Sequence, residues 1–73
     1  MPHIIIKLYP GRSEEQKKKL TDAIVKDVVS IANCEAKTVS VAIEEVNPKD
    51  WAEKVYKPDI LGNKDKLYKE PGE

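Results

Sequence analysis

The first strongly patterned stretch of the chain is PHIIIKL, in which successive residues alternate between two faces. One face carries Pro2, Ile4, Ile6 and Leu8, and the other carries His3, Ile5 and Lys7. This period of two predicts a β-strand over residues 2–8. Because isoleucines occur on both faces, neither face of this strand is purely polar.

A period of three to four residues follows the turn residues Pro10 and Gly11. Ser13 and Gln16 have the spacing of a capping box, which predicts a helix that runs to about Asn33. The expected apolar stripe, which should lie on a sheet, consists of Leu20, Ala23, Ile24, Val28 and Ile31. The side chains expected to face water are Lys17, Lys18, Asp22 and Lys26.

Alternation returns in TVSVAIEEV, which predicts a second strand. The order strand, helix, strand predicts an α+β fold built on a right-handed β-α-β unit with parallel strands. Asn47 and Pro48 suit the start of a short helix that carries Trp51 and Val55 and is closed by Pro58. A weak helical turn around residues 65–69 and an irregular tail complete a single domain over residues 1–73.

Two strands and one covering helix leave exposed sheet edges and a small core. The chain has 73 residues and a single cysteine, Cys34, so no intrachain disulfide can reinforce the fold. We therefore expect a symmetric homo-oligomer that joins such units into a wider sheet, with the active site at the seam between chains.

The charge balance excludes several classes of partner. Thirteen basic and thirteen acidic residues give no net charge, so we expect neither nucleic acid nor an anionic membrane as a partner. The sequence contains no membrane-length apolar run and no signal-peptide pattern, which places the protein in the cytoplasm as an expectation. It also lacks zinc-ligand spacing and a glycine-rich phosphate loop, so no metal or cofactor is expected.

Two segments of the chain, PHIIIKLYPGRSEEQKKKLTDAI and TVSVAIEEVNPKDW, resemble the 4-oxalocrotonate tautomerase family of the tautomerase/MIF superfamily. The resemblance extends from Pro2 to about Trp51, and the longer tail is similar to that of the dimeric subgroup. It implies a homodimer in preference to a hexamer. It also implies that Met1 is removed in the mature protein, so that the secondary amine of Pro2 is the catalytic base.

An N-terminal amine suits keto-enol tautomerisation, because its ordinary pKa of about 7.7 to 8.0 lies close to ambient pH. A retained Met1 would turn this nitrogen into an amide without a basic lone pair. The alternative is that Pro2 only starts an edge strand and is compatible with methionine removal. His3 alternates to the opposite face and is expected to be a surface or interface histidine.

The resemblance implies two further site residues and contains one departure. Arg12 matches the arginine that binds the substrate carboxylate, and Trp51 falls where the family has an aromatic wall. Ser40 stands where hexameric members carry a second arginine, so a monocarboxylic enol such as phenylpyruvate enol fits better than a dicarboxylate. The alternatives are a solvated arginine at a helix start, a core tryptophan beside Val55 and a small strand residue.

The function expected from these residues is a cofactor-independent keto-enol tautomerase of small 2-keto acids and their enols. Some relatives use the same proline for dehalogenation or hydration, but the sequence offers no clear group to activate water. A third interpretation, from a different class, is a non-catalytic oligomeric ligand-binding module in which the proline nitrogen is never unmasked.

Overall fold

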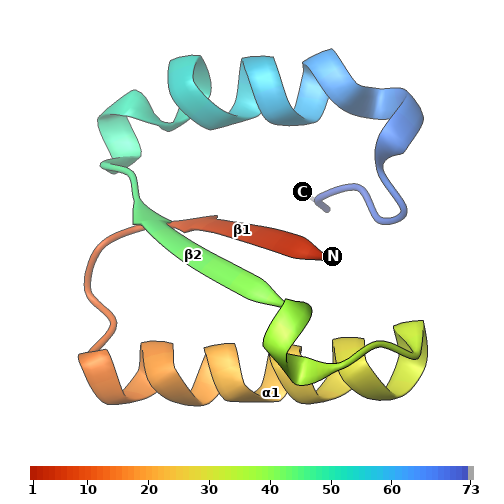
Figure 1. Ribbon diagram of the computed structural model, residues 1–73. Coiled ribbons are helices and arrows are strands. Elements are labelled where there is room, and N and C mark those ends of the chain that lie inside the picture. The colour runs from red at the N-terminus through yellow and green to blue at the C-terminus, as the bar shows by residue number, and fades with distance from the viewer. Residues whose placement is uncertain (73) are drawn as a thin grey trace.

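The fold is a two-stranded sheet between two helical layers (Figure 1). The computed structural model describes residues 1–72. Strand β1 (His3–Leu8) is followed by helix α1 (Glu14–Ala32), the short 3₁₀ turn η1 (Ala36–Thr38) and strand β2 (Ser40–Glu45). The two strands are parallel, with His3 opposite Ser40 and Leu8 opposite Glu45, which confirms the predicted β-α-β unit.

Helix α1 begins and ends as the sequence predicts. The Ser13 hydroxyl accepts a hydrogen bond from the Gln16 backbone N–H at 3.1 Å, and the Gln16 side chain accepts one from the Ser13 N–H at 2.9 Å. This capping box satisfies two N–H groups that have no partner within the helix. At the other end, Asn33 adopts a left-handed conformation with φ of 57°, which terminates the helix.

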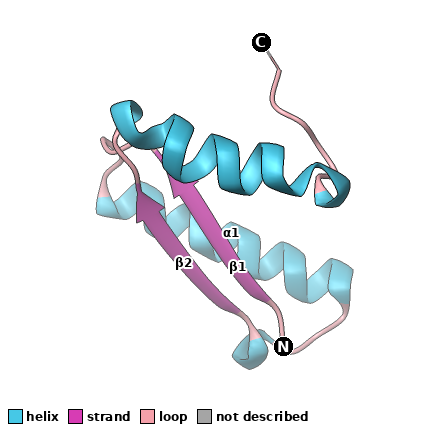
Figure 2. Cartoon of the chain, turned by 90° about the horizontal axis from the view of Figure 1, so that it is seen from above, coloured by secondary structure: helices cyan, strands magenta, loops and turns pink. Residues whose placement is uncertain are grey.

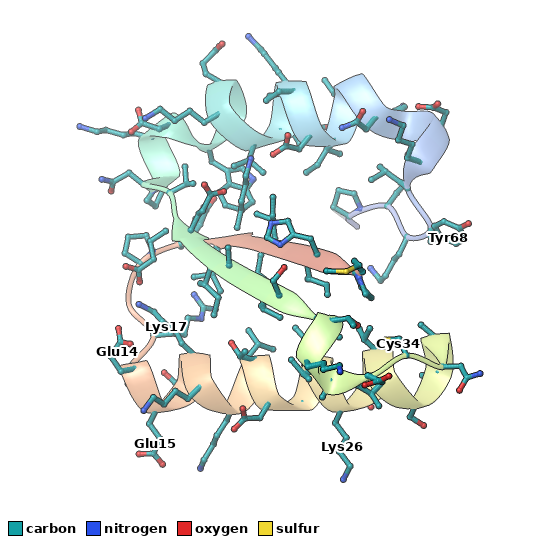
Figure 3. All side chains as sticks on the ribbon, in the orientation of Figure 1. Glu14, Glu15, Lys17, Lys26, Cys34 and Tyr68 are labelled. Carbon is teal, nitrogen blue, oxygen red and sulfur yellow. The ribbon has the colours of Figure 1, made fainter. Side chains whose placement is uncertain are left out.

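The face that α1 turns toward the sheet differs from the predicted stripe. Ile31 is 83% exposed and Leu20 is 38% exposed, while Lys17 lies half-buried with its side chain only 18% exposed. Lys17 was expected to face water. It instead reaches toward the sheet side of α1 and pairs with Glu45 of β2 at 3.0 Å, whereas Glu15 and Lys26 point away (Figure 3). The half-buried positions of the helix are Lys17, Thr21, Ile24, Val25, Val28 and Val29.

The physical reason for this shift is the amphipathic character of lysine. Its aliphatic stem can cover apolar surface while the ammonium group reaches a carboxylate at the rim. A hydrophobicity pattern assigns each residue to one class and therefore misplaces such a side chain. The ion pairs of Lys17 with Glu45 and Glu14 raise its pKa above the ordinary value of 10.5.

The second face of the sheet is covered by the same chain. The C-terminal segment forms the 3₁₀ turn η2 (Pro48–Asp50), the π-helix η3 (Ala52–Ile60) and the 3₁₀ segment η4 (Leu61–Lys66). Figure 2 shows this segment crossing over the two strands on the side opposite α1. Val55 of η3 is the one buried hydrophobic side chain in residues 1–72, at 4% exposure.

Three details of this segment correct the sequence predictions. Pro58 does not close the helix but lies inside η3, where the wider π-helical turn relieves the clash between the ring and the preceding turn. The Asn47 side chain makes no capping hydrogen bond, and its backbone carbonyl accepts from the Asp50 N–H at 2.9 Å instead. The helical turn expected around residues 65–69 is found earlier, at Leu61–Lys66.

We predict that Ser13→Ala lowers the free energy of unfolding by about 1 kcal/mol, because it removes the side-chain acceptor of the capping box. Urea denaturation followed by circular dichroism measures this change. Ser30→Ala is the matched control, since Ser30 is exposed in the same helix and alanine is the better helix former. An equal loss in both variants would contradict the role assigned to the cap.

Candidate active site

Pro2 and Ser40 lie together where the two strands begin. The Pro2 carbonyl accepts a hydrogen bond from the Ser40 N–H at 3.1 Å, which joins the chain start to β2. Pro2 is half-buried, whereas Met1 before it is 99% exposed. Removal of Met1 would therefore expose the proline nitrogen at this end of the sheet without disturbing a buried side chain.

The Ser40 hydroxyl already has a partner in the chain. Its Oγ lies 2.6 Å from Nδ1 of His3, and the imidazole tautomer decides which of the two donates. The parallel register explains the contact, because His3 and Ser40 are directly opposite one another and share a face. The sequence predicted that His3 turns away from Pro2, and gave no indication that it meets Ser40.

Arg12 and Trp51 lie together where the strands end. They line a groove of about 280 Å³ with Lys7, Leu8 and Tyr9. Gly11, with φ of 127°, allows the sharp turn that brings the chain from β1 to Arg12 and α1. The Trp51 ring packs edge to face against Tyr9, with ring centroids 5.0 Å apart and an interplanar angle of 86°.

The Arg12 guanidinium is a cation without a carboxylate partner among residues 1–72. Its hydrogen bond there goes to the Tyr9 carbonyl at 3.5 Å, a long contact. An arginine in this state can present its planar fork to a carboxylate from outside the chain. The aromatic pair beside it provides an apolar surface against which a planar substrate could stack.

A second, larger hollow of about 430 Å³ adjoins this groove through Lys7 and Trp51, which line both. Its other lining residues are Ile5, Val55, Asp59, Ile60 and Asn63. Trp51 thus lines the groove and also the hollow that contains the buried Val55, a position that suits both roles considered from the sequence.

Sequence reasoning missed Lys7 and Tyr9 as residues of this groove. The available signal was the alternation of β1, since continuing its period of two places Tyr9 on the same side as Ile5 and Lys7. The Lys7 ammonium donates to Asp59 of η3 at 2.6 Å, across 52 positions of sequence. This hydrogen bond with Asp59 is the main reason why the pKa of Lys7 is raised above its ordinary 10.5.

The two clusters lie far apart within one chain. Pro2 precedes the six-residue strand β1, and Arg12 follows it. From Pro2 to Leu8 the strand covers about 20 Å at the usual rise of roughly 3.3 Å per residue. A small organic acid cannot touch both ends, so the structure does not bring Pro2 and Arg12 into a common cleft within the chain.

Within residues 1–72, no three His, Cys, Asp or Glu side chains cluster in a way that could hold a metal ion. Among the same residues, no helix combines the length and the apolar character needed to cross a membrane.

Comparison with known proteins identifies the family. The model of the tautomerase family, described as tautomerase enzyme, matches residues 2–55. The chain therefore belongs to the tautomerase family and is an isomerase, which confirms the resemblance seen in its sequence. This membership favours an enzyme over the non-catalytic ligand-binding module considered above.

Relatives and solved structures agree with this assignment. The chain is 40% identical to the "Probable tautomerase" of Xylella fastidiosa over 72 residues, which cover 99% of this chain and 88% of that protein. It is 34% identical to Tautomerase PptA of Cronobacter sakazakii, with 99% and 96% covered. A structure of a 4-oxalocrotonate tautomerase isozyme from Methylibium petroleiphilum superimposes with a TM-score of 0.64 at 31% identity, over 66% of this chain and 75% of that one.

We predict that the ion pair of Lys7 and Asp59 stabilises the fold below about pH 10.5 and ceases to do so in more alkaline solution. The pKa of Lys7 is raised on folding, so the stabilisation is fully present below the unfolded-state value of 10.5 and is lost as pH rises through the folded-state pKa. The measurement is the difference in unfolding midpoint between the unaltered protein and Lys7→Gln from pH 8 to pH 12.

This difference should be constant up to about pH 10 and then shrink. Lys54→Gln is the control, because the Lys54 ammonium approaches Asp50 only to 3.9 Å. The Lys54 side chain is 69% exposed, compared with 29% for Lys7, while Asp50 and Asp59 are both 40% exposed. A Lys7→Gln difference that grows with pH would contradict the assignment.

Proposed function

We propose that this tautomerase interconverts the keto and enol forms of small 2-keto acids, with Pro2 as general base and acid and Arg12 as the carboxylate anchor. The observation that carries the proposal is the guanidinium of Arg12, which has no carboxylate partner among residues 1–72 and lies beside Trp51 and Tyr9 in one groove. Monocarboxylic enols such as phenylpyruvate enol are the proposed substrates.

The proline contributes the proton chemistry. With Met1 removed, its secondary amine takes a proton from the enol and returns it to the neighbouring carbon. An α-amino group has an ordinary pKa of about 7.7 to 8.0, so a substantial fraction is unprotonated near neutral pH. A lysine, with an ordinary value near 10.4, would be almost entirely charged.

The proposed substrate class follows from the charges of the site residues. Arg12 supplies one cation for a carboxylate, and Trp51 with Tyr9 supplies a surface for a planar chain or aryl group. Ser40, at the other end of the sheet, offers a neutral hydroxyl rather than a second charge. A single carboxylate is therefore the group that this arrangement binds best.

We infer that the complete site forms between two chains. Both outer edges of the two-stranded sheet lack a strand partner in residues 1–72. A second copy related by a two-fold axis, with its strands antiparallel to the first, places Arg12 and Trp51 of one chain beside Pro2 and Ser40 of the other. A homodimer is the smallest assembly that provides this, and each dimer then holds two equivalent sites.

Two further expectations stay predictions: residues 1–73 form one domain, and the protein acts in the cytoplasm.

We predict that extending the chain in front of Pro2 abolishes turnover, because the proline nitrogen becomes an amide. Loss of a general acid-base group lowers the rate by about 10²- to 10⁴-fold. The assay follows the ultraviolet absorbance of fresh phenylenolpyruvate with processed protein, whose free proline is verified by intact mass, and with a form extended by a short tag. Equal rates in the two forms would eliminate Pro2 as the base.

In the same assay, Arg12→Ala should lower kcat/KM by about 10- to 100-fold, as expected when charge-assisted hydrogen bonds are lost. Lys26→Ala is the matched control, because Lys26 is an exposed cation that points away from the sheet (Figure 3).

We predict that two impaired chains restore activity when they are combined. One chain carries the N-terminal extension and an intact Arg12, and the other carries a free Pro2 and Arg12→Ala. A mixed dimer contains one site with Pro2 from the second chain and Arg12 from the first, so co-expressed protein should regain up to one intact site per mixed pair.

The measurement is turnover of the purified mixed dimer, isolated by two different affinity tags and compared with each parent alone. A site confined to one chain would leave the mixed dimer no more active than its parents. That result would contradict the shared site. The roles of Pro2 and Arg12 would still be decided by the phenylenolpyruvate assay of the single variants.

A further inference from the structure

Two cations line the groove proposed to bind substrate, and their states differ. Arg12 has no carboxylate partner among residues 1–72, and its hydrogen bond goes to a backbone carbonyl. Lys7, in contrast, is held by Asp59, with its ammonium nitrogen 2.6 Å from Oδ2. The side chains of this ion pair are 29% and 40% exposed, and Lys7 lines both the groove and the larger hollow, whereas Asp59 lines the larger hollow.

We propose that Asp59 is a positioning residue that occupies Lys7 and thereby keeps a second substrate carboxylate from binding there. The groove then offers one available cation, Arg12, and selects monocarboxylates over dicarboxylates. This inference rests on the proposed function, since it names the substrate class of the same groove and the residue that sets it.

The physical argument is competition for one ammonium group. A substrate carboxylate that binds Lys7 must displace the carboxylate of Asp59, which is held in place by η3 and is always present. A tethered partner acts at an effective concentration on the order of millimolar or more. Exchanging one charge-assisted hydrogen bond for another therefore gains little, and the second carboxylate loses its hydration without a net new partner.

The fold brings Asp59 next to Lys7 although the two residues are far apart in the sequence. Lys7 comes from β1, and Asp59 comes from the C-terminal segment that covers the same face of the sheet. The two residues and Trp51 line the larger hollow, and Lys7 and Trp51 also line the groove of Arg12. A ligand that extends from Arg12 past Trp51 would thus reach Lys7, whose ammonium group is already paired with Asp59.

The test uses binding, because the chain contains a single tryptophan and Trp51 lines both hollows. Quenching of its fluorescence is titrated with trans,trans-muconate and with sorbate, which share a six-carbon diene and differ by one carboxylate. The quantity compared is the ratio of the two dissociation constants, sorbate over muconate, which is higher when the dicarboxylate is preferred.

We expect Asp59→Asn to raise this ratio about five- to tenfold, because the freed Lys7 gains a charge-assisted hydrogen bond to the second carboxylate. Asp59→Glu, which restores a carboxylate, should keep the ratio of the unaltered protein. In the double variant Lys7→Gln/Asp59→Asn the gain should disappear. Asp50→Asn is the matched control, since Asp50 pairs with the exposed Lys54 at 3.9 Å, and its ratio should not change.

Lys7→Gln alone provides a second, independent measurement should Asp59→Asn fold poorly. A masked Lys7 contributes nothing to the second carboxylate, so this variant should leave the ratio unchanged. A fall in the ratio would mean that Lys7 already binds that carboxylate, which overturns the proposal.

The proposal is also overturned if Asp59→Asn weakens the binding of both ligands equally and leaves the ratio constant. The ion pair would then only hold the C-terminal segment in place. Absence of quenching by either ligand in every variant would overturn it as well.

These outcomes are distinct from failure of the proposed function. Proton transfer by Pro2 does not enter the ratio of the two dissociation constants, so the titration does not depend on Pro2 being the catalytic base. If Arg12→Ala binds sorbate as tightly as the unaltered protein does, the carboxylate anchor is wrong, whereas the effect of Asp59 is still decided by the ratio.

Discussion

The constraint on which this structure depends is that a two-stranded sheet has two faces and two open edges. One chain of 73 residues covers both faces, with α1 on one and the segment from η2 to η4 on the other. It leaves the edges unpaired within residues 1–72, and Val55 is the one buried hydrophobic side chain there. A core this small gains most from a second chain, so assembly and folding free energy are expected to be linked.

The length of β1 gives this constraint a chemical consequence. The strand separates the start of the sheet, with Pro2 and Ser40, from its end, with Arg12 and Trp51, by much more than the size of a small acid. A base and an anchor at opposite ends of one rigid strand cannot act on one substrate. The open edges leave the single chain marginally stable. In our proposal, a second chain at these edges brings the start of one sheet beside the end of the other.

Ion pairs between elements connect the layers and engage two of the chain's lysines. Lys17 joins α1 to β2 through Glu45, and Lys7 joins β1 to η3 through Asp59. Both lysines are half-buried, and each ammonium group reaches a carboxylate on another element. Arg12 stands outside these pairs. In this family member, the charges that hold the fold together and the charge proposed to bind substrate are thus carried by different residues.

The sequence by itself determined the local elements and the family. Three features depend on neighbours within a few residues and can therefore be predicted from the sequence. They are the alternation in β1, the capping box at Ser13 and the spacing of the second strand. Only the tertiary structure decided the rest. Lys17 turned inward, Pro58 stayed inside a helix, and Lys7 found Asp59 across 52 positions, because these outcomes depend on which elements pack together and no local period encodes that.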